Sequence, residues 1–325
     1  MMGYFLGVDV GSSKTHALIV DEGGQCCGFG QAWGGNQQSV GYEGLANALQ
    51  KSFEQARLMA DIPADQVRGA GFGIAGYDFP SDREPHLKAI ASLGLRCPVD
   101  LMNDGCNGLL AGTSHGIGVN VTAGSGVNCR GRGPDGREGR IVGNGASFGE
   151  FGGGAEIAWK GLHMVNYAWI KRIPPTKLTA IYLEASGAAD EQDLMQGLSN
   201  EFYHLGPFIA IKIFEAAREG DAAALEVIRF SGEELGWLVV SVVRQIGMEH
   251  DEVEIVQSGS VFDGGELIDS PMRRVILEHV PGAKITRLEC LPVIGPVILG
   301  MLAAGVDGYQ VRPQIQQTSR ELIRE

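Results

Sequence analysis

Two aspartates stand near the ends of short apolar segments, each beside a turn of small residues. In GVDVGSSKTHALIVD, Asp9 lies in a predicted strand over 5–10, and a glycine-containing turn follows. Such a turn can direct the backbone N–H groups of Gly11, Ser12 and Ser13 toward phosphate oxygens, while Asp9 holds a hydrated Mg²⁺ ion. The segment lacks the GxxxxGK[ST] pattern of a P-loop, and plain β-turns share its composition, so alone it does not establish a phosphate site.

The second aspartate, Asp104, lies in LMNDGCNGLLAG, where a predicted strand over 99–102 ends and a helix begins. An aspartate at this point can act simply as the N-cap of the helix. A carboxylate at the end of a buried strand can also face a ligand. There it can accept the proton of a substrate hydroxyl while that oxygen attacks the γ-phosphate of ATP, so Asp104 is our candidate catalytic base.

A second turn of small residues joins two predicted strands in VTAGSGVNCRG. It consists of Gly124, Ser125 and Gly126, and it repeats the device seen after Asp9. One such hairpin is uninformative, but two of them match a clamp that holds a polyphosphate from both sides.

Two other segments are rich in small residues. A strand over 253–257 leads into Ser258, Gly259 and Ser260, which are small enough to let a flat adenine or a ribose approach the backbone. The segment over 142–158 contains six glycines before a predicted helix and carries the acid Glu150. We interpret it as a loop that shapes a polar pocket for a small molecule.

Composition excludes several classes of function. The 325 residues carry a net charge of −13 and no run of more than two Lys or Arg, so a nucleic-acid or membrane partner is not expected. Six scattered cysteines without CxxC spacing predict reduced thiols, and the N-terminus lacks a signal-peptide pattern, so we expect a cytoplasmic protein. The 49 glycines indicate many tight turns and close approaches of backbone to ligand.

The order of predicted elements is a strand-then-helix plan that occurs twice, with helices enlarging the second copy. This order predicts an α/β fold of two related lobes with mixed sheets and a cleft between them. The predicted domains are a first lobe over 1–114 and a second lobe over 115–308. A C-terminal helix over 309–325 is expected to pack on the first lobe.

Taken in order, these segments resemble the actin/hexokinase/Hsp70 superfamily, which has a two-lobed, ribonuclease H-like ATPase fold. Within it they resemble the N-acetylglucosamine kinase and BadF/BadG/BcrA/BcrD ATPase family. The family motif G-[VI]-D-G-G-G-T-K-T matches Gly7–Thr15, with Val10, Ser12 and Ser13 as departures. The second motif, G-T-G-S-N-C, matches Gly124–Cys129, with Val127 in place of serine.

The resemblance implies a set of site residues in addition to Asp104 and Asp9. It places Lys14 and Thr15 with the first phosphate turn, and it makes Ser258–Ser260 the adenosine segment. Sugar contacts are implied at Asn36, Asn128 and Glu150, the last standing where the family has aspartate. ATP and Mg²⁺ are the implied cofactors, and a homodimer is the implied assembly.

Three functions remain open at this point. The first is a kinase that phosphorylates an amino sugar such as N-acetylglucosamine or glucosamine. The second is an ATPase that activates an iron–sulfur reductase, although the candidate cluster ligands Cys106 and Cys129 lie inside the sugar- and phosphate-binding segments. The third is a sugar sensor without turnover.

Overall fold

The computed structural model describes residues 3–324, and it divides the chain into two compact units. Unit 1 contains residues up to 118 together with 287–325, and unit 2 contains 119–286. Residues 1, 2 and 325, which the predicted domain ranges include, lie outside the described part. The division differs from the predicted boundary at 308, because residues 287–308 group with the N-terminal unit. Within 3–324, no helix combines the length and the apolar character needed to cross a bilayer.

Unit 1 is built on a five-stranded mixed sheet with the order β3-β2-β1-β4-β5. Strands β1 and β2 and strands β2 and β3 pair antiparallel, whereas β4 runs parallel to both β1 and β5. The strands are β1 (Tyr4–Val10), β2 (Lys14–Asp21), β3 (Cys26–Trp33), β4 (Val67–Ile74) and β5 (Val99–Asn103).

Alternating side chains of β1 enter two separate cores. Leu6, Val8 and Val10 pack with helices α1 (Gln37–Met59) and α2 (Arg83–Ala91), and Phe5 packs on the opposite face. That opposite face is covered by α10 (Ile294–Ala303) and α11 (Arg312–Arg324), with α3 (Asn107–Gly112) beside them. The period of two in a strand therefore explains how one short segment holds together two helical layers.

Helix α10 lies unusually close to the sheet because glycines line the strand surface beneath it. A Cβ atom on Gly7 would lie 2.3 Å from the Val297 nitrogen, and one on Gly71 would lie 2.1 Å from the Pro296 carbonyl oxygen. This fit explains why residues after 287 belong to unit 1. The terminal helix α11 is tied to the same unit, since Thr318 Oγ1 accepts a hydrogen bond from the Cys26 N–H at 3.1 Å.

Unit 2 contains the second five-stranded sheet, with the order β10-β9-β6-β7-β8. Strands β6 and β9 are parallel, and β7 and β8 are antiparallel, so this sheet is mixed as well. The strands are β6 (Gly118–Ala123), β7 (Val127–Arg132), β8 (Glu138–Arg140), β9 (Val253–Ser258) and β10 (Ala283–Arg287). The predicted α/β class with two mixed sheets is confirmed.

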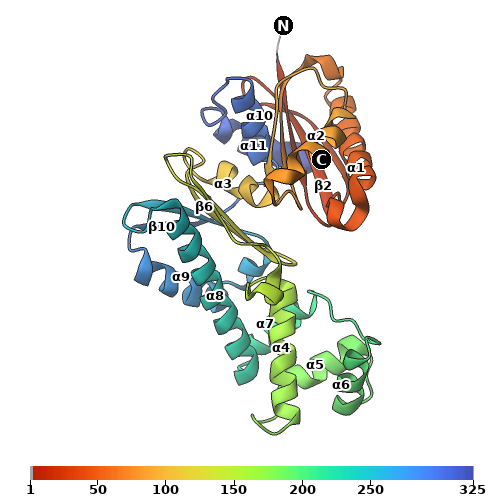
Figure 1. Ribbon diagram of the computed structural model, residues 1–325, viewed down its shortest axis with the longest axis vertical. Helices are drawn as coiled ribbons and strands as arrows, with labels where there is room; N and C mark the ends of the chain where they lie inside the picture. The colour runs from red at the N-terminus through yellow and green to blue at the C-terminus, as the bar shows by residue number, and fades with distance from the viewer. Residues whose placement is uncertain (1–2, 325) are drawn as a thin grey trace. The chain divides into compact units, whose positions relative to one another are not determined.

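Helices make up most of the rest of unit 2 (Figure 1). They are α4 (Gly154–Trp169), α5 (Lys177–Ser186), α6 (Glu191–Ser199), α7 (Ile209–Arg218), α8 (Ala222–Ile246) and α9 (Glu266–His279). The long helix α8 begins at Asp221, whose side chain accepts from the Ala224 N–H, and ends at Gly247 in the left-handed conformation. Both are ordinary helix-terminating devices, and they fix the length of the main support for this sheet.

Candidate functional site

The predicted site residues of unit 1 gather at one edge of its sheet. Strands β1, β3, β4 and β5 all run in the same direction, so their carboxyl ends meet at this edge. The turn after β1 carries Gly11, the segment after β3 carries Asn36, and Asp104 follows β5 directly. The carboxyl edge of parallel strands is the usual place for ligands in α/β folds.

The turn after β1 is supported by the segment after β3. The Gly11 N–H donates to the Lys14 carbonyl at 2.9 Å and closes the turn, and the Gly35 N–H donates to the Gly11 carbonyl at 3.1 Å. The Asn36 amide donates to Ser12 Oγ at 3.3 Å. Asn36, predicted as a sugar contact, is thus joined to the predicted phosphate turn.

The four residues after Gly11 differ in what they present to solvent. Ser12, Ser13 and Lys14 are exposed, as a turn that binds phosphate requires. Thr15 is fully buried, and its hydroxyl donates to the Trp33 carbonyl at 2.9 Å. Its side chain therefore joins β2 to β3.

A network of side chains fixes the turn that carries Asp104. Asn103 Oδ1 accepts from the Gly105 N–H at 2.9 Å, and Asn103 Nδ2 donates to Asp78 Oδ1 at 3.0 Å and to the Tyr77 carbonyl at 3.1 Å. Asp104 itself is partly exposed and opens a short 3₁₀ turn. The cap of this turn is Asn103, not Asp104. The N-cap explanation for Asp104 is therefore wrong.

Asp9 lies near the end of β1, half-buried, and its electrostatic surroundings are unusual. Burial raises the pKa of Asp9 to about 7, and the neighbouring Asp104 carboxylate adds to the rise. A hydrogen bond from Asn107 Nδ2 to Asp9 Oδ1 at 2.7 Å and the charge of Lys14 act in the opposite direction. The carboxylates of Asp9 and Asp104 thus interact electrostatically within unit 1.

In unit 2 the predicted phosphate turn rests on the start of α4. The Gly124 N–H donates to the Gly126 carbonyl at 3.0 Å, which closes the turn between β6 and β7. At the beginning of α4, the Gly154 and Ala155 N–H groups donate to the carbonyls of Gly124 and Ser125, both at 2.8 Å. The turn is held from behind, and Ser125 and Gly126 remain exposed.

The predicted adenosine segment lies against the same turn. Gly259 adopts a φ of +97°, and a Cβ atom there would lie 2.3 Å from the Ala123 carbonyl oxygen, the residue before Gly124. Ser258 is buried, and its hydroxyl lies 2.8 Å from Thr122 Oγ1 on the adjacent strand. Unit 2 therefore brings Ser258–Ser260 and Gly124–Gly126 together.

The two acids near this turn are both occupied by backbone groups. Glu150 is buried, and its carboxylate accepts from the N–H groups of Val142, Gly143 and Asn144 at 2.7, 2.8 and 2.9 Å. Glu156 accepts from the Gly153 N–H at 2.9 Å, and burial raises its pKa. Glu150 thus holds the glycine-rich loop together.

Asn128, the third predicted sugar contact, lies half-buried on β7 directly after the turn. The preceding Val127 is 6% exposed, so its side chain belongs to the core of unit 2.

Sequence reasoning missed four residues of this arrangement. Asp78 follows β4 at the same sheet edge as Asp104, and its position after a strand was a usable signal. Asn103 and Asn107 flank the turn of Asp104, but nothing in their spacing indicated their partners. Glu156 was hidden within the glycine-rich segment. Within residues 3–324 no group of three or more His, Cys, Asp or Glu side chains is arranged to hold a metal ion.

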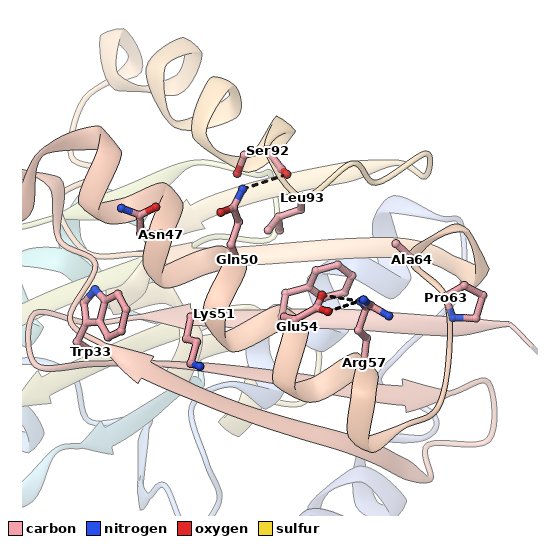
Figure 2. A pocket seen from close by; sticks show the side chains of 11 residues that line it. Trp33, Asn47, Gln50, Lys51, Glu54, Arg57, Pro63, Ala64, Ser92 and Leu93 are labelled. Atoms are coloured by element: carbon pink, nitrogen blue, oxygen red, sulfur yellow. Dashed lines mark hydrogen bonds and ion pairs between the residues drawn. The ribbon is translucent and has the colours of Figure 1, made fainter.

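A pocket of about 890 Å³ lies elsewhere on unit 1, along the outer side of α1 (Figure 2). Its lining includes Trp33, Gln50, Lys51 and the ion pair of Arg57 with Glu54. None of its lining residues is a predicted site residue. The pocket and the predicted site residues therefore do not coincide.

Known proteins are similar to this chain over most of its length. The BadF/BadG/BcrA/BcrD ATPase family profile matches residues 6–299. An N-acetyl-D-glucosamine kinase of Dictyostelium discoideum is 26% identical over 314 residues, covering 91% of this chain and 97% of the relative. An N-acetylmuramic acid/N-acetylglucosamine kinase of Clostridium acetobutylicum is 24% identical over 304 residues, covering 92% and 98%.

Solved structures agree with the fold. A candidate N-acetylglucosamine kinase from Chromobacterium violaceum superposes with a TM-score of 0.71 at 21% identity, covering 91% of this chain and 98% of its own. A ROK family glucokinase from Streptomyces griseus, solved with glucose and AMPPNP, gives a TM-score of 0.54 at 18% identity and covers 94% and 98%.

Proposed function

Because the chain belongs to the BadF/BadG/BcrA/BcrD ATPase family, we propose that it is an ATP-dependent kinase that phosphorylates a hydroxyl of an amino sugar such as N-acetylglucosamine or glucosamine. The two curated relatives, both named as N-acetylglucosamine kinases, span nearly their whole length in this chain and favour this substrate class. The observation that carries the proposal is the position of Asp104 at a sheet edge, on a turn capped by Asn103. Its negative charge also acts on Asp9, whose pKa it raises.

In the proposed reaction Asp104 accepts the proton of the acceptor hydroxyl while that oxygen attacks the γ-phosphorus of ATP and the bond to the β–γ bridging oxygen breaks. Proton acceptance prevents positive charge from building on the attacking oxygen. Positioning and electrostatic stabilisation supply most of the rate in phosphoryl transfer, so a base held on a capped turn is well suited to the task.

The nucleotide is proposed to bind through backbone N–H groups. In unit 1 these are the exposed turn residues Gly11–Ser13, with Lys14 beside them, and in unit 2 they are Gly124–Gly126. Ser258–Ser260 would receive the adenosine, because this segment lies against the strand that leads into Gly124–Gly126, with Gly259 packed on Ala123. A net charge of −13 does not oppose this binding, because turns of this kind offer local partial positive charge.

Asp9 suits a hydrated Mg²⁺ ion. Its carboxylate is a hard oxygen donor, and the neighbouring Asp104 carboxylate disfavours a second negative charge unless a cation is present. When bound with ATP, Mg²⁺ would neutralise charge on the β- and γ-phosphates. Thr15 would contribute through the strand pairing that keeps the turn in place, in keeping with its hydrogen bond to Trp33.

For the acceptor we propose Asn36 and Asn128 as hydroxyl contacts. Glu150 enters the proposal in a modified form: with its carboxylate bound to three N–H groups, it shapes the loop and can offer its remaining lone pairs to a sugar hydroxyl. We further propose a cytoplasmic location and a homodimer. Light scattering of the purified protein would test the homodimer.

The iron–sulfur activator function has less support. A cluster is bound by thiolates, and burial strongly raises the pKa of the Cys129 thiol. The other candidate, Cys106, is half-buried on the turn of Asp104. Neither position suits a cluster shared at a surface.

The testing experiment is release of ADP from Mg·ATP with a panel of amino sugars and hexoses. Turnover that requires N-acetylglucosamine or glucosamine supports the proposal. Hydrolysis of equal rate without any sugar would favour an ATPase, and absence of turnover with every sugar would favour a sensor.

A further inference from the structure

Asn107 is a buried polar residue whose side chain forms a hydrogen bond with Asp9. It is 1% exposed at the start of α3, and its Nδ2 donates to Asp9 Oδ1 at 2.7 Å across 98 positions of sequence. Its Oδ1 is buried without a hydrogen-bond partner among residues 3–324. A buried amide with one unsatisfied atom costs stability, so an apolar side chain would serve the core better. The contact with Asp9 is therefore the reason for an amide here.

The surroundings of Asn107 are shaped to admit it. Gly73 on β4 pairs with Asp9 on β1, and a Cβ atom on Gly73 would lie 1.7 Å from Asn107 Oδ1. On the other side, a Cβ atom on Gly295 would lie 2.2 Å from the Asn107 carbonyl oxygen. Gly73 thus leaves space for the side-chain amide of Asn107 beside the Asp9 carboxylate, and Gly295 lets α10 approach the backbone of Asn107.

The chemistry of an amide fits the partner. Asp104 stands three residues before Asn107, on the 3₁₀ turn that leads into α3. An uncharged amide can hold the Asp9 carboxylate in place by a single donated hydrogen bond. Asp9 Oδ2 receives no hydrogen bond from the described residues 3–324, so only one of its two oxygens is committed to the protein.

We propose that Asn107 is a positioning residue that orients Asp9 toward the metal–nucleotide, with Gly73 providing its space. The inference rests on the proposed function, in which Asp9 binds the hydrated cation. By fixing Oδ1, Asn107 presents Oδ2 in one orientation, as residues beyond the direct ligands do in metal sites. The same turn then places both Asp104 and the support of Asp9.

The test is binding of Mn²⁺ in the presence of ADP, followed by electron paramagnetic resonance of free Mn²⁺ without any sugar. Asn107→Ala and Asn107→Leu are compared with wild type and with Asn47→Ala, an exposed amide on α1. The leucine variant keeps the core filled and removes the unsatisfied oxygen, so it provides a folded protein if the alanine variant is unstable. Circular dichroism checks folding of each.

We expect Mn²⁺ affinity to fall about tenfold or more in both Asn107 variants, the range for loss of a residue that supports a metal ligand. Binding of ADP in EDTA should stay within about twofold in both, and Asn47→Ala should match wild type. Folded Asn107 variants with wild-type Mn²⁺ affinity would overturn the inference while leaving the proposed function standing. A wild-type protein that binds no Mn²⁺ with ADP would instead contradict the proposed role of Asp9.

Discussion

The amide of Asn103 donates to Asp78 Oδ1 at 3.0 Å, and so joins the carboxyl ends of two parallel strands next to Asp104. The same side chain caps the turn on which Asp104 stands, because its Oδ1 accepts from the Gly105 N–H. Asp78 Oδ2 also accepts from Gln38 Nε2 at 3.2 Å at the start of α1. Asp78 therefore connects the end of β5 and the start of α1 to the segment that follows β4.

From this anchor we predict that Asp78→Ala lowers kcat about tenfold and leaves the KM for ATP within about twofold. Loss of the anchor removes one of the hydrogen bonds of Asn103 and loosens the turn that carries Asp104, whereas the turn at Gly11–Ser13 keeps its own hydrogen bonds. Steady-state kinetics with the best acceptor measures both constants. A double-mutant cycle with Asn103→Ala should be strongly non-additive. Additive losses would show that the two residues act separately.

Asp9 makes the stability of the protein depend on pH. The pKa of Asp9 is about 7 in the folded state against an ordinary 3.8, so between these values the folded protein holds a proton that the unfolded chain has released. Stability from this group therefore falls as pH rises from about 4 to 7 and is constant above. Asp9→Asn cannot ionise, and its side-chain oxygen can still accept from Asn107.

Asp9→Asn should consequently raise the melting temperature by roughly 5 °C at pH 8 in metal-free buffer, and by much less at pH 5. Differential scanning calorimetry of both proteins at the two pH values measures the difference. An equal gain at pH 5 and pH 8 would mean that ionisation of Asp9 is not its cause.

Glu150 should matter first for the loop it organises. Glu150→Ala removes the acceptor of three N–H groups and is expected to lower the free energy of unfolding of unit 2 by about 2–4 kcal/mol. Glu278→Ala, an exposed residue on α9, is the matched control and should stay within about 0.5 kcal/mol. Urea unfolding provides the comparison. A Glu150→Ala protein as stable as the control would refute this role.

Substitution of two glycines distinguishes a glycine needed for packing, Gly71, from one proposed to contact a ligand, Gly124. Gly71→Ala places a Cβ atom 2.1 Å from the Pro296 carbonyl and should disrupt the packing of α10, seen as a large loss of thermal stability. At Gly124 an added Cβ meets no atom within 4 Å, so Gly124→Ala should fold normally. If the turn binds phosphate closely, Gly124→Ala lowers the affinity for ATP by at least about tenfold and leaves the stability unchanged. Calorimetric titration with ATP measures this affinity. Wild-type affinity for ATP in Gly124→Ala would exclude close phosphate contact there.

Local patterns in the sequence predicted much of this molecule. Alternation of apolar residues predicted β1, and turns of small residues predicted the hairpins at Gly11–Ser13 and Gly124–Gly126. The expectation that the C-terminal helix packs on the first lobe agrees with the contact of Thr318 and Cys26. Asp104 was singled out because a carboxylate at a strand end can face a ligand, and its catalytic role stays a prediction.

The remainder depends on contacts between distant segments. The affiliation of residues 287–308 with unit 1 follows from glycines on β1 and β4 that admit α10, and no local pattern reveals such a fit. The same holds for Asn107, whose partner Asp9 is 98 positions away. Glu150 was predicted from its alignment with a family motif, but its three backbone partners depend on a loop conformation that glycine-rich sequence leaves open.

The most direct test of the account is Asp104→Asn, assayed beside wild type with Mg·ATP and the preferred amino sugar. Asparagine preserves the size of the side chain but cannot accept the hydroxyl proton as a carboxylate does. We predict that phosphoryl transfer falls at least about 10²-fold, while ATP binding stays within about threefold of wild type. Transfer at the wild-type rate in a protein that binds ATP normally would remove Asp104 from the mechanism.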